Sequence, residues 1–397
     1  MEGLRILVTD SDARSALAAV RSLGRAGHHV VAAGPRHPSL ASVSRYCAEA
    51  LTYPDPAKDS AGFVRTIVDA ASCQKIDVLM PMTEITTLLL TQNQERLPRH
   101  CKLPFPDDKS VSLASDKAHV LDLAHTLGVP IPATIKLDAP QDITTVAANL
   151  TYPVVIKPAR SRVLVDGHFV STSVAYALDG SDLERKVRAL PEAVFPVLLQ
   201  ERIEGPGVGV FACFAEGRPV ALFAHTRLRE KPPSGGVSVL RESAPLDPVA
   251  VEHSERLLRA LAWKGVAMVE FKRDQRDGSL RLMEINGRFW GSLQLAIDAG
   301  VDFPALLADI AVGRTPPPVR SYRVGVRTRW LWGDVDSLLQ VLFRSHAQLN
   351  LPPTAPTRLR WLAEFLKLWG RDMHYEVLRR DDLKPWLLET RRWFTER

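Results

Sequence analysis

Two apolar runs, 266–271 and 280–285, stand on either side of a short turn, and this pattern constrains the local fold more than any other feature of the chain. Runs of this length and spacing predict two antiparallel strands. Glu284 and Asn286 point to the same face because side chains alternate along a strand. Strand pairing also brings Glu270 close to them. We therefore expect a cluster of oxygen atoms on one face of a sheet.

Such a cluster suits a hard divalent cation. Mg²⁺ prefers oxygen ligands and binds through few carboxylates, completing its shell with waters and phosphates. Two neighbouring glutamates repel one another in a buried site unless a cation compensates them. We assign Glu270, Glu284 and Asn286 as ligands of Mg²⁺, or of Mn²⁺ in its place. Arg288 lies on the same face and could clamp a phosphoryl or carboxylate oxygen.

The first 110 residues alternate between apolar runs and helical patterns. Short apolar runs occur at 4–8, 29–33 and 76–82, and helical periodicity occurs at 13–25 and 61–71. Such alternation predicts a parallel α/β domain, to which we assign residues 1–112. The first strand-to-helix turn carries no glycine, which argues against a nicotinamide or flavin dinucleotide there.

From residue 113 to 320 the pattern changes to short strands mixed with turns and a few helices, which predicts sheet-rich α+β structure. The extended segment Val129 to Ile131, interrupted by Pro130, indicates a junction, and we place a smaller subdomain at about 130–199. The proline-rich stretch ending at Pro318 reads as a linker.

Residues 321–397 differ in composition, with six of the eight tryptophans and an excess of basic over acidic side chains. We expect a helical extension that packs its aromatics on the preceding domain and presents a solvated basic face. The alternative is docking on a membrane surface or a protein.

Composition excludes several other classes of protein. A net charge of +6 over 397 residues, without a clustered basic stripe, argues against a nucleic-acid partner. The four cysteines lie far apart and suggest neither zinc nor disulfides. The N-terminus lacks a signal-peptide pattern and no apolar run is long enough for a membrane span, so we expect a cytoplasmic protein.

Two further segments suggest anion and base recognition. Lys157 ends an apolar strand, where a buried ammonium is costly unless an anion such as phosphate compensates it. The segment 198–207 is a polar hinge after another apolar strand, whose main-chain groups could read the edge of an adenine.

Taken in order along the chain, these features resemble the ATP-grasp superfamily over about residues 1–315, most clearly at Met283 to Arg288. The resemblance implies a Rossmann-like pre-ATP-grasp domain at 1–112, an ATP-grasp domain with a lid subdomain at 113–320, and a helical C-terminal extension. It also implies that Lys117 and Lys157 hold ATP phosphates. Dimerisation is common in the superfamily, so a homodimer stays open.

The resemblance further implies that the hinge segment 198–207 binds the adenosine part of ATP. Gln200 and Glu201 would line the adenine site, Ile203 would donate its backbone N–H to adenine, and Glu204 is the nearest candidate for the ribose. The lid departs from the family, because the segment 159–167 retains a single glycine where many members have a glycine-rich loop. Arg160 could replace the missing amide donors, since a guanidinium also matches phosphate oxygens.

The segment 227–238 is rich in cations and loop formers and looks like a substrate-facing loop. Arg229, Lys231 and Arg241 could bind the carboxylate of an acyl acceptor or the γ-phosphate. An exposed, solvated loop is the alternative.

The resemblance implies an ATP-dependent ligase that activates a small-molecule carboxylate as an acyl phosphate and joins it to an amine. One alternative is a bicarbonate-activating enzyme of the carbamoyl-phosphate-synthase or carboxylase kind. The other is a nucleotide-binding scaffold protein that has lost turnover through its altered lid.

Overall fold

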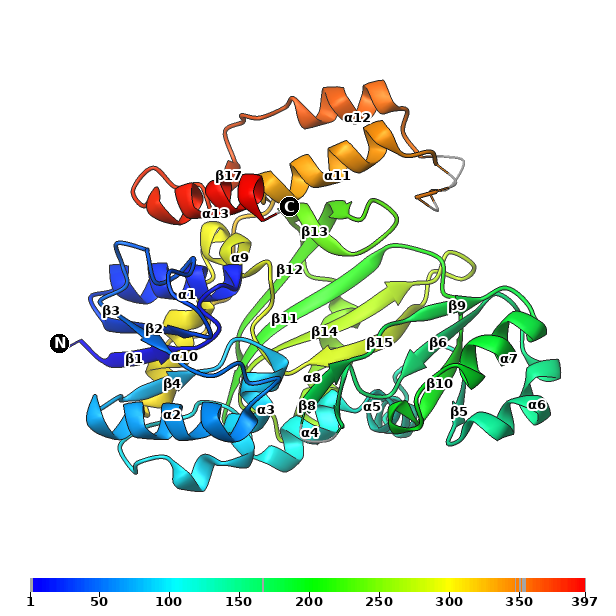
Figure 1. The fold of residues 1–397 in the computed structure, drawn as a ribbon, viewed down its shortest axis with the longest axis horizontal. Coiled ribbons are helices and arrows are strands. Elements are labelled where there is room, and N and C mark those ends of the chain that lie inside the picture. Colours follow the sequence, from blue (N-terminus) through cyan, green and yellow to red (C-terminus); the bar gives the residue numbers. More distant parts are fainter. Residues whose placement is uncertain (1–2, 166–167, 347, 350, 352–354, 397) are drawn as a thin grey trace.

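The computed structural model describes residues 3–165, 168–346, 348–349, 351 and 355–396. Within these residues the strands form four sheets, and Figure 1 shows a small α/β unit and a lid unit at opposite ends of a long central sheet. The predicted combination of α/β and α+β architecture is confirmed.

The N-terminal unit contains a parallel sheet in the order β3-β2-β1-β4. Its strands are β1 (Arg5–Val8), β2 (His29–Gly34), β3 (Glu49–Thr52) and β4 (Val78–Met80), and its helices are α1 (Arg14–Arg25), α2 (Ser60–Cys73) and α3 (Glu84–Gln92). The predicted strand–helix alternation is confirmed, but β3 was not predicted. This edge strand is largely exposed and therefore lacks the apolar run that marks a buried strand.

Two helices lead from this unit to the lid, α4 (Asp108–Ser115) and α5 (Lys117–Thr126). The lid contains an antiparallel sheet in the order β5-β10-β6-β9 and a separate hairpin. Its elements are β5 (Thr134–Leu137), α6 (Ile143–Val146), β6 (Val154–Pro158), β7 (Arg162–Val165), β8 (His168–Ser171), β9 (Ala175–Ala177), α7 (Gly180–Arg188) and β10 (Val197–Glu201). Its small apolar core includes Ile156, Leu183 and Leu199. Short 3₁₀ turns lie at Gln94–Arg96, Pro140–Asp142, Ala147–Asn149 and Glu192–Val194.

The central sheet has the order β15-β14-β11-β12-β13-β16-β17. Its strands are β11 (Gly207–Ala215), β12 (Arg218–Lys231), β13 (Val237–Ser243), β14 (Gly265–Arg273), β15 (Leu280–Asn286), β16 (Arg327–Arg329) and β17 (Met373–Tyr375). The helices α8 (Pro248–Ala260), α9 (Leu293–Ala299) and α10 (Phe303–Ala311) pack beside it. Phe211, Phe223 and Phe303 share one apolar core with the N-terminal sheet, so these two parts are packed together.

The segment 227–238 is not the loop that its composition suggests. Arg227 to Lys231 continues β12, and β13 begins at Val237, so only the tip of this hairpin is irregular. Pro232 and Gly235 dominate the local pattern, yet the flanking residues pair with neighbouring strands that satisfy their backbone hydrogen bonds. Tertiary pairing therefore overrides local propensity here.

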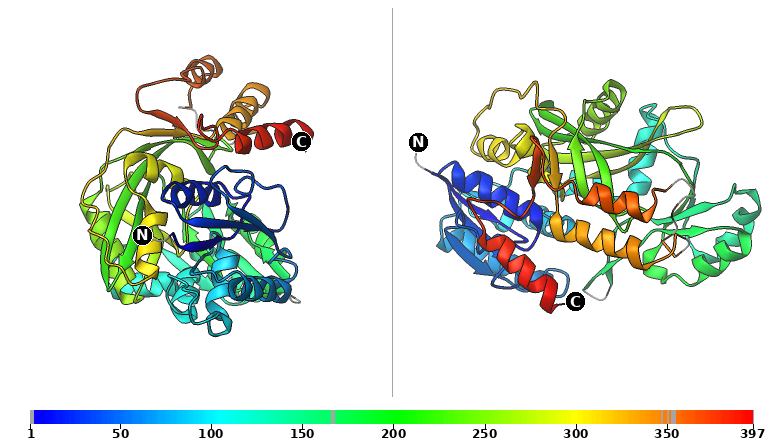
Figure 2. Two further views of the ribbon diagram at one scale, coloured as in Figure 1. Left: turned by 90° about the vertical axis from the view of Figure 1, so that its left-hand side faces the viewer. Right: turned by 90° about the horizontal axis from the view of Figure 1, so that it is seen from above.

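The C-terminal residues form more than a helical extension. Their helices are α11 (Leu331–Phe343), α12 (Arg358–Phe365) and α13 (Lys384–Thr395). However, β16 and β17 also add two strands to the central sheet, with β16 beside β13. Figure 2 shows α13 beside the N-terminal unit, whereas α11 and α12 lie along the outer edge of the molecule. Within the described residues, none of the helices combines the length and the apolar character that crossing a bilayer requires.

Buried ion pairs tie the C-terminal residues to the rest of the molecule. Arg21 of α1 donates from Nε to Asp382 at 2.9 Å, and both side chains are buried. Glu376 accepts from Arg14 at 2.9 Å and also pairs with the buried Arg241. These contacts join one end of the sequence to the other.

Glu389 of α13 provides a pH-dependent contribution to this packing. Burial raises its pKa to about 7, although its carboxylate accepts a hydrogen bond from the indole of Trp330 at 2.8 Å. Because this pKa lies above the ordinary glutamate value of 4.5, the folded protein holds the proton more tightly than the unfolded chain does. The stabilisation by Glu389 is therefore fully present below about pH 4.5 and is lost as the pH rises through about 7.

Glu389→Gln stays neutral at every pH and can still accept the Trp330 hydrogen bond. We expect this variant to exceed the wild type in unfolding free energy by about 1–3 kcal/mol at pH 8, and by much less at pH 5. Denaturant unfolding at both values measures the difference. Glu396→Gln, at an exposed position just after α13, is the control and should show no such pH trend. A constant difference across this range would contradict the assignment.

Candidate functional site

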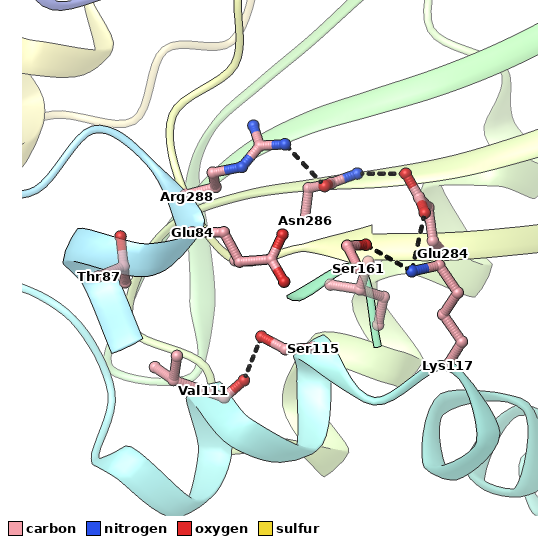
Figure 3. A pocket seen from close by; sticks show the side chains of 11 residues that line it. Glu84, Thr87, Val111, Ser115, Lys117, Ser161, Glu284, Asn286 and Arg288 are labelled. Atoms are coloured by element: carbon pink, nitrogen blue, oxygen red, sulfur yellow. Dashed lines mark hydrogen bonds and ion pairs between the residues drawn. The ribbon is translucent and has the colours of Figure 1, made fainter. Parts of the chain in front are cut away.

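The predicted oxygen cluster lies on β14 and β15, where Glu270 stands opposite Glu284 in the strand register. Asn286 donates from Nδ2 to Oε1 of Glu284 at 2.9 Å, and Arg288 donates from Nη2 to Oδ1 of Asn286 at 3.0 Å (Figure 3). The amide oxygen of Asn286 and both carboxylates thus come from adjacent strands. The structure brings together all four residues that the hairpin pattern singles out.

Cations from three other elements surround these carboxylates. Lys117, at the start of α5, lies 3.6 Å from Oε2 of Glu284 and donates to Oγ of Ser161 at 2.8 Å. Arg227 on β12 lies 3.1 Å from Oε1 of Glu270. Lys157 on the lid strand β6 donates to Oε1 of Gln200 at 3.2 Å. Burial lowers the pKa of Lys157, although Glu284 acts in the opposite direction.

The two glutamates differ in their protonation. Burial raises the pKa of Glu270 to about 6, and the neighbouring charge of Glu284 adds to this effect. Burial also acts to raise the pKa of Glu284, but Lys117, the Asn286 hydrogen bond and Lys157 outweigh it and hold the pKa below its ordinary value. Glu284 is therefore ionised near neutral pH, and the repulsion between the two adjacent carboxylates appears as the raised pKa of Glu270.

The donor set fits a magnesium ion. Among the described residues no group of three or more His, Cys, Asp and Glu side chains is placed to hold a metal. The cluster here consists of two carboxylates and one amide oxygen, which is the hard, incomplete set expected of Mg²⁺ that also binds waters and substrate phosphates. The raised pKa of Glu270 is consistent with a site in which a cation would relieve carboxylate repulsion.

A narrow pocket lies at this cluster between the N-terminal unit and the central sheet. Lys117, Ser161, Glu284, Asn286 and Arg288 line one part of it, and Glu84 of α3 reaches it from the opposite side (Figure 3). Glu84 was not among the residues predicted from the sequence. Its position shortly after β4 could have indicated it, because ligands of parallel α/β sheets bind near the carboxyl ends of the strands.

A larger cavity, of about 1180 Å³, borders Glu270 on the side of the lid. Glycines at 205, 207 and 209 line it together with Tyr176, Lys272 and Met283. The small glycines leave room for a ligand close to the backbone. The oxygen cluster therefore lies between two open spaces, with Glu270 facing the larger one and Glu284 the smaller one.

The first two hinge residues, Gln200 and Glu201, have different partners. Gln200 is buried and directs its amide oxygen to Lys157, while its nitrogen donates to Thr134 at 3.0 Å. The carboxylate of Glu201 instead accepts from the backbone N–H of Ala133 and pairs with Arg276.

The remaining hinge residues have partners other than the oxygen cluster. Ile203 accepts at its carbonyl oxygen from Lys272 at 3.1 Å. Glu204 lines a separate open pocket that also contains Glu201 and Arg276. The adenine and ribose roles of these residues therefore stay predictions.

Four cations from the sequence predictions pair with carboxylates outside the cluster. Arg229 donates from Nε to Asp334 at 2.8 Å, and Lys231 pairs with Asp336. Arg241 is buried against Glu376, and Arg160 lies 3.3 Å from Asp116. The first three meet carboxylates from residues 334–376, a long-range pairing that a local loop pattern cannot indicate. The structure does not bring these four side chains to Glu284.

Comparison with known proteins extends this description. Residues 194–333 match the family model described as ATP-grasp in the biosynthetic pathway with Ter operon. A search of curated proteins finds no matching sequence.

Several solved structures share the fold at low sequence identity. A biotin carboxylase from Campylobacter jejuni is 16% identical with a TM-score of 0.65, and the match covers 81% of this chain and 74% of that one. An L-amino acid ligase from Bacillus licheniformis is 16% identical with a TM-score of 0.60, covering 79% and 75%. N5-carboxyaminoimidazole synthetase from Staphylococcus aureus complexed with ADP is 16% identical with a TM-score of 0.62, covering 86% of each chain.

Proposed function

We propose that this chain, which has the ATP-grasp fold, is an ATP- and Mg²⁺-dependent ligase that activates a small-molecule carboxylate and joins it to an amine. The observation that carries the proposal is the cluster of Glu270, Glu284 and Asn286, with Lys117 beside Glu284 and Lys157 close enough to interact electrostatically with both carboxylates. Oxygen ligands for a cation beside ammonium groups form the arrangement that phosphoryl transfer requires.

In the proposed reaction the substrate carboxylate attacks the γ-phosphorus of ATP, and the bond to the β,γ-bridging oxygen breaks to release ADP. Lys117 and Lys157 would hold phosphate oxygens, and Arg288 would offset negative charge on the transferring group. The carboxylates and amide oxygen would hold Mg²⁺, which supplies charge neutralisation at the phosphates.

The neutral amine then attacks the carbonyl carbon of the acyl phosphate. The C–N bond forms as the C–O bond to phosphate breaks, and the departing phosphate takes the proton that the nitrogen loses. The chain needs no covalent nucleophile for either step. Glu84 faces the pocket across from Lys117 and would accept a hydrogen bond from the amine, which orients it toward the acyl carbon. The lid would exclude water, which otherwise hydrolyses the acyl phosphate.

The decisive experiment is a screen of carboxylic acids with amines, with ADP formation and product mass as readouts. ADP release that needs both substrates, together with a condensed product, supports the proposal. Bicarbonate-stimulated ADP release without an organic acid would instead indicate the bicarbonate-activating alternative. Nucleotide-dependent thermal stabilisation without turnover for any pair would indicate the scaffold alternative.

Lys157 offers a separate test of nucleotide binding. Its ammonium is buried, so removing it should leave the triphosphate site without a compensating charge. We expect Lys157→Met to weaken ADP binding by roughly tenfold or more, measured by titration calorimetry. Lys136→Met is the matched control, because Lys136 lies on β5 of the same sheet but is half-exposed and pairs with Asp138. Equal affinities of the two variants would contradict the phosphate role of Lys157.

A further inference from the structure

The outer face of α12 carries apolar side chains that no other part of the described chain covers. Leu359 is 80% exposed and Leu366 is 60% exposed, and these residues are two helical turns apart, on one face. Trp369, just after the helix, is 76% exposed. Phe343, at the end of the neighbouring α11, is 80% exposed. We call these four residues the α12 apolar face.

This face contrasts with the other side of the same helix. Trp361, Leu362 and Phe365 are half-buried, and the ring of Phe365 lies under the guanidinium of Arg329 at 4.3 Å. The helix is thus anchored to the molecule by one side only. Elsewhere among the C-terminal aromatics, Trp332 and Trp393 stack on each other at 4.2 Å, while Phe394 of α13 is 68% exposed.

Basic side chains surround the α12 apolar face. Between Ser337 and Met373 the sequence has five Lys and Arg residues and two acidic residues, Glu364 and Asp372. All five are exposed: Arg344, Arg358, Arg360, Lys367 and Arg371. Glu364 pairs with Lys367 at 2.6 Å and also interacts electrostatically with Arg360, and these three side chains line a groove that α12 forms with β12 and β13. The region therefore keeps a clear positive excess around an apolar centre.

We propose that the α12 apolar face and its basic rim dock on the surface of a bilayer that contains anionic lipids. Apolar side chains on one face of a helix, flanked by Lys and Arg, enter the boundary between headgroups and acyl chains while the cations bind anionic headgroups. The helix has only Arg358–Phe365, so it lies on the bilayer and does not cross it. A symmetric contact between two copies is disfavoured, because it would place two basic rims against each other.

Docking at this place leaves the oxygen cluster uncovered. The α12 apolar face lies on the outer edge of the molecule, beyond β13 and β16, whereas the oxygen cluster is on β14 and β15 at the other side of the sheet (Figure 1). Such docking does not require the proposed ligase activity, and it would place a substrate or product next to a membrane without blocking the site.

The test uses the full chain and lipid vesicles. We expect cosedimentation with vesicles of phosphatidylcholine and phosphatidylglycerol, weak cosedimentation with pure phosphatidylcholine, and weaker binding as the salt concentration rises. Tryptophan emission should shift to the blue on binding to the anionic vesicles, and Trp369→Phe should remove most of that shift. Equal binding to both kinds of vesicle, or no binding to either, would overturn the proposal.

Variants locate the contact on the surface. Leu359→Ser combined with Leu366→Ser should lower the vesicle partition coefficient by about tenfold or more, because two apolar side chains no longer enter the bilayer. The matched control is Leu383→Ser combined with Leu387→Ser, two exposed leucines at α13. Circular dichroism and thermal unfolding check that both proteins fold.

The charges have their own pair of variants. Arg358→Gln combined with Arg371→Gln should reduce binding to anionic vesicles, whereas Arg65→Gln combined with Arg320→Gln, exposed positions elsewhere, should not. The proposal would be overturned if the protein with Leu359→Ser and Leu366→Ser bound vesicles as strongly as the control with Leu383→Ser and Leu387→Ser. A protein that ignores vesicles but forms a dimer that the Leu359 and Leu366 changes convert to a monomer would also overturn it, because a second copy would then cover this face.

Discussion

Glu284→Gln is expected to lower Mg²⁺-dependent ADP formation by at least about a hundredfold. Glu284 accepts from Asn286, lies 3.6 Å from Lys117, and has a lowered pKa, so the wild-type side chain is ionised at neutral pH. Glutamine preserves its shape but removes the charge that a divalent cation needs. Steady-state ADP release with saturating substrates measures the change.

A binding measurement separates this effect from damage to the fold. Titration calorimetry of ADP with and without Mg²⁺ should show that the metal strengthens binding to the wild type far more than to Glu284→Gln. Glu252→Gln, on the exposed surface of α8, removes one carboxylate elsewhere and should behave like the wild type. Wild-type ADP release by Glu284→Gln would remove Glu284 from the metal site and with it the central part of the proposed function.

Asp382→Ala is expected to lower the free energy of unfolding by about 3–5 kcal/mol. Asp382 is buried and accepts from Nε of Arg21 at 2.9 Å, from Oγ of Ser44 at 2.6 Å, and from the backbone N–H of Arg45 at 2.9 Å. Its loss leaves the buried guanidinium of Arg21 without its charged partner. Denaturant unfolding of the full chain measures the effect.

The adjacent residue supplies the control for this prediction. Asp381 pairs with Arg25, but both side chains are well exposed, at 44% and 39%. Water screens such a pair, so Asp381→Ala should cost at most about 1 kcal/mol. Similar losses for the two alanine variants would show that the Arg21–Asp382 pair does not hold the C-terminal residues to α1.

The oxygen cluster was predictable because its information is local. Residues 266–286 form one hairpin, and alternation along its strands is enough to place Glu284 and Asn286 on one face with Glu270 beside them. Lys157 was predictable for a related reason, since an ammonium at the end of an apolar strand demands a compensating group. Their roles in binding metal and phosphate stay predictions.

Other features depend on residues that are far apart in the sequence. Glu84 joins the pocket only because the N-terminal unit packs against the central sheet. Arg229 and Lys231 had the composition of a ligand-binding loop, but each pairs with an aspartate more than a hundred residues later, Asp334 and Asp336 respectively, and the Arg229–Asp334 pair is buried. Local pattern carries no signal for either outcome.

By itself, the sequence determined those features that a single segment encodes through its pattern of apolar and polar residues. These are the alternating strands and helices of the N-terminal unit, the acidic hairpin, and the basic, tryptophan-rich character of the C-terminal residues. Only the tertiary structure adds β16 and β17 to the edge of the central sheet. It also determines which carboxylate pairs with each arginine and which face of α12 is left uncovered. The physical reason is that strand pairing and charge burial take their free energy from partners distant in the chain, and periodicity within one segment does not encode those partners.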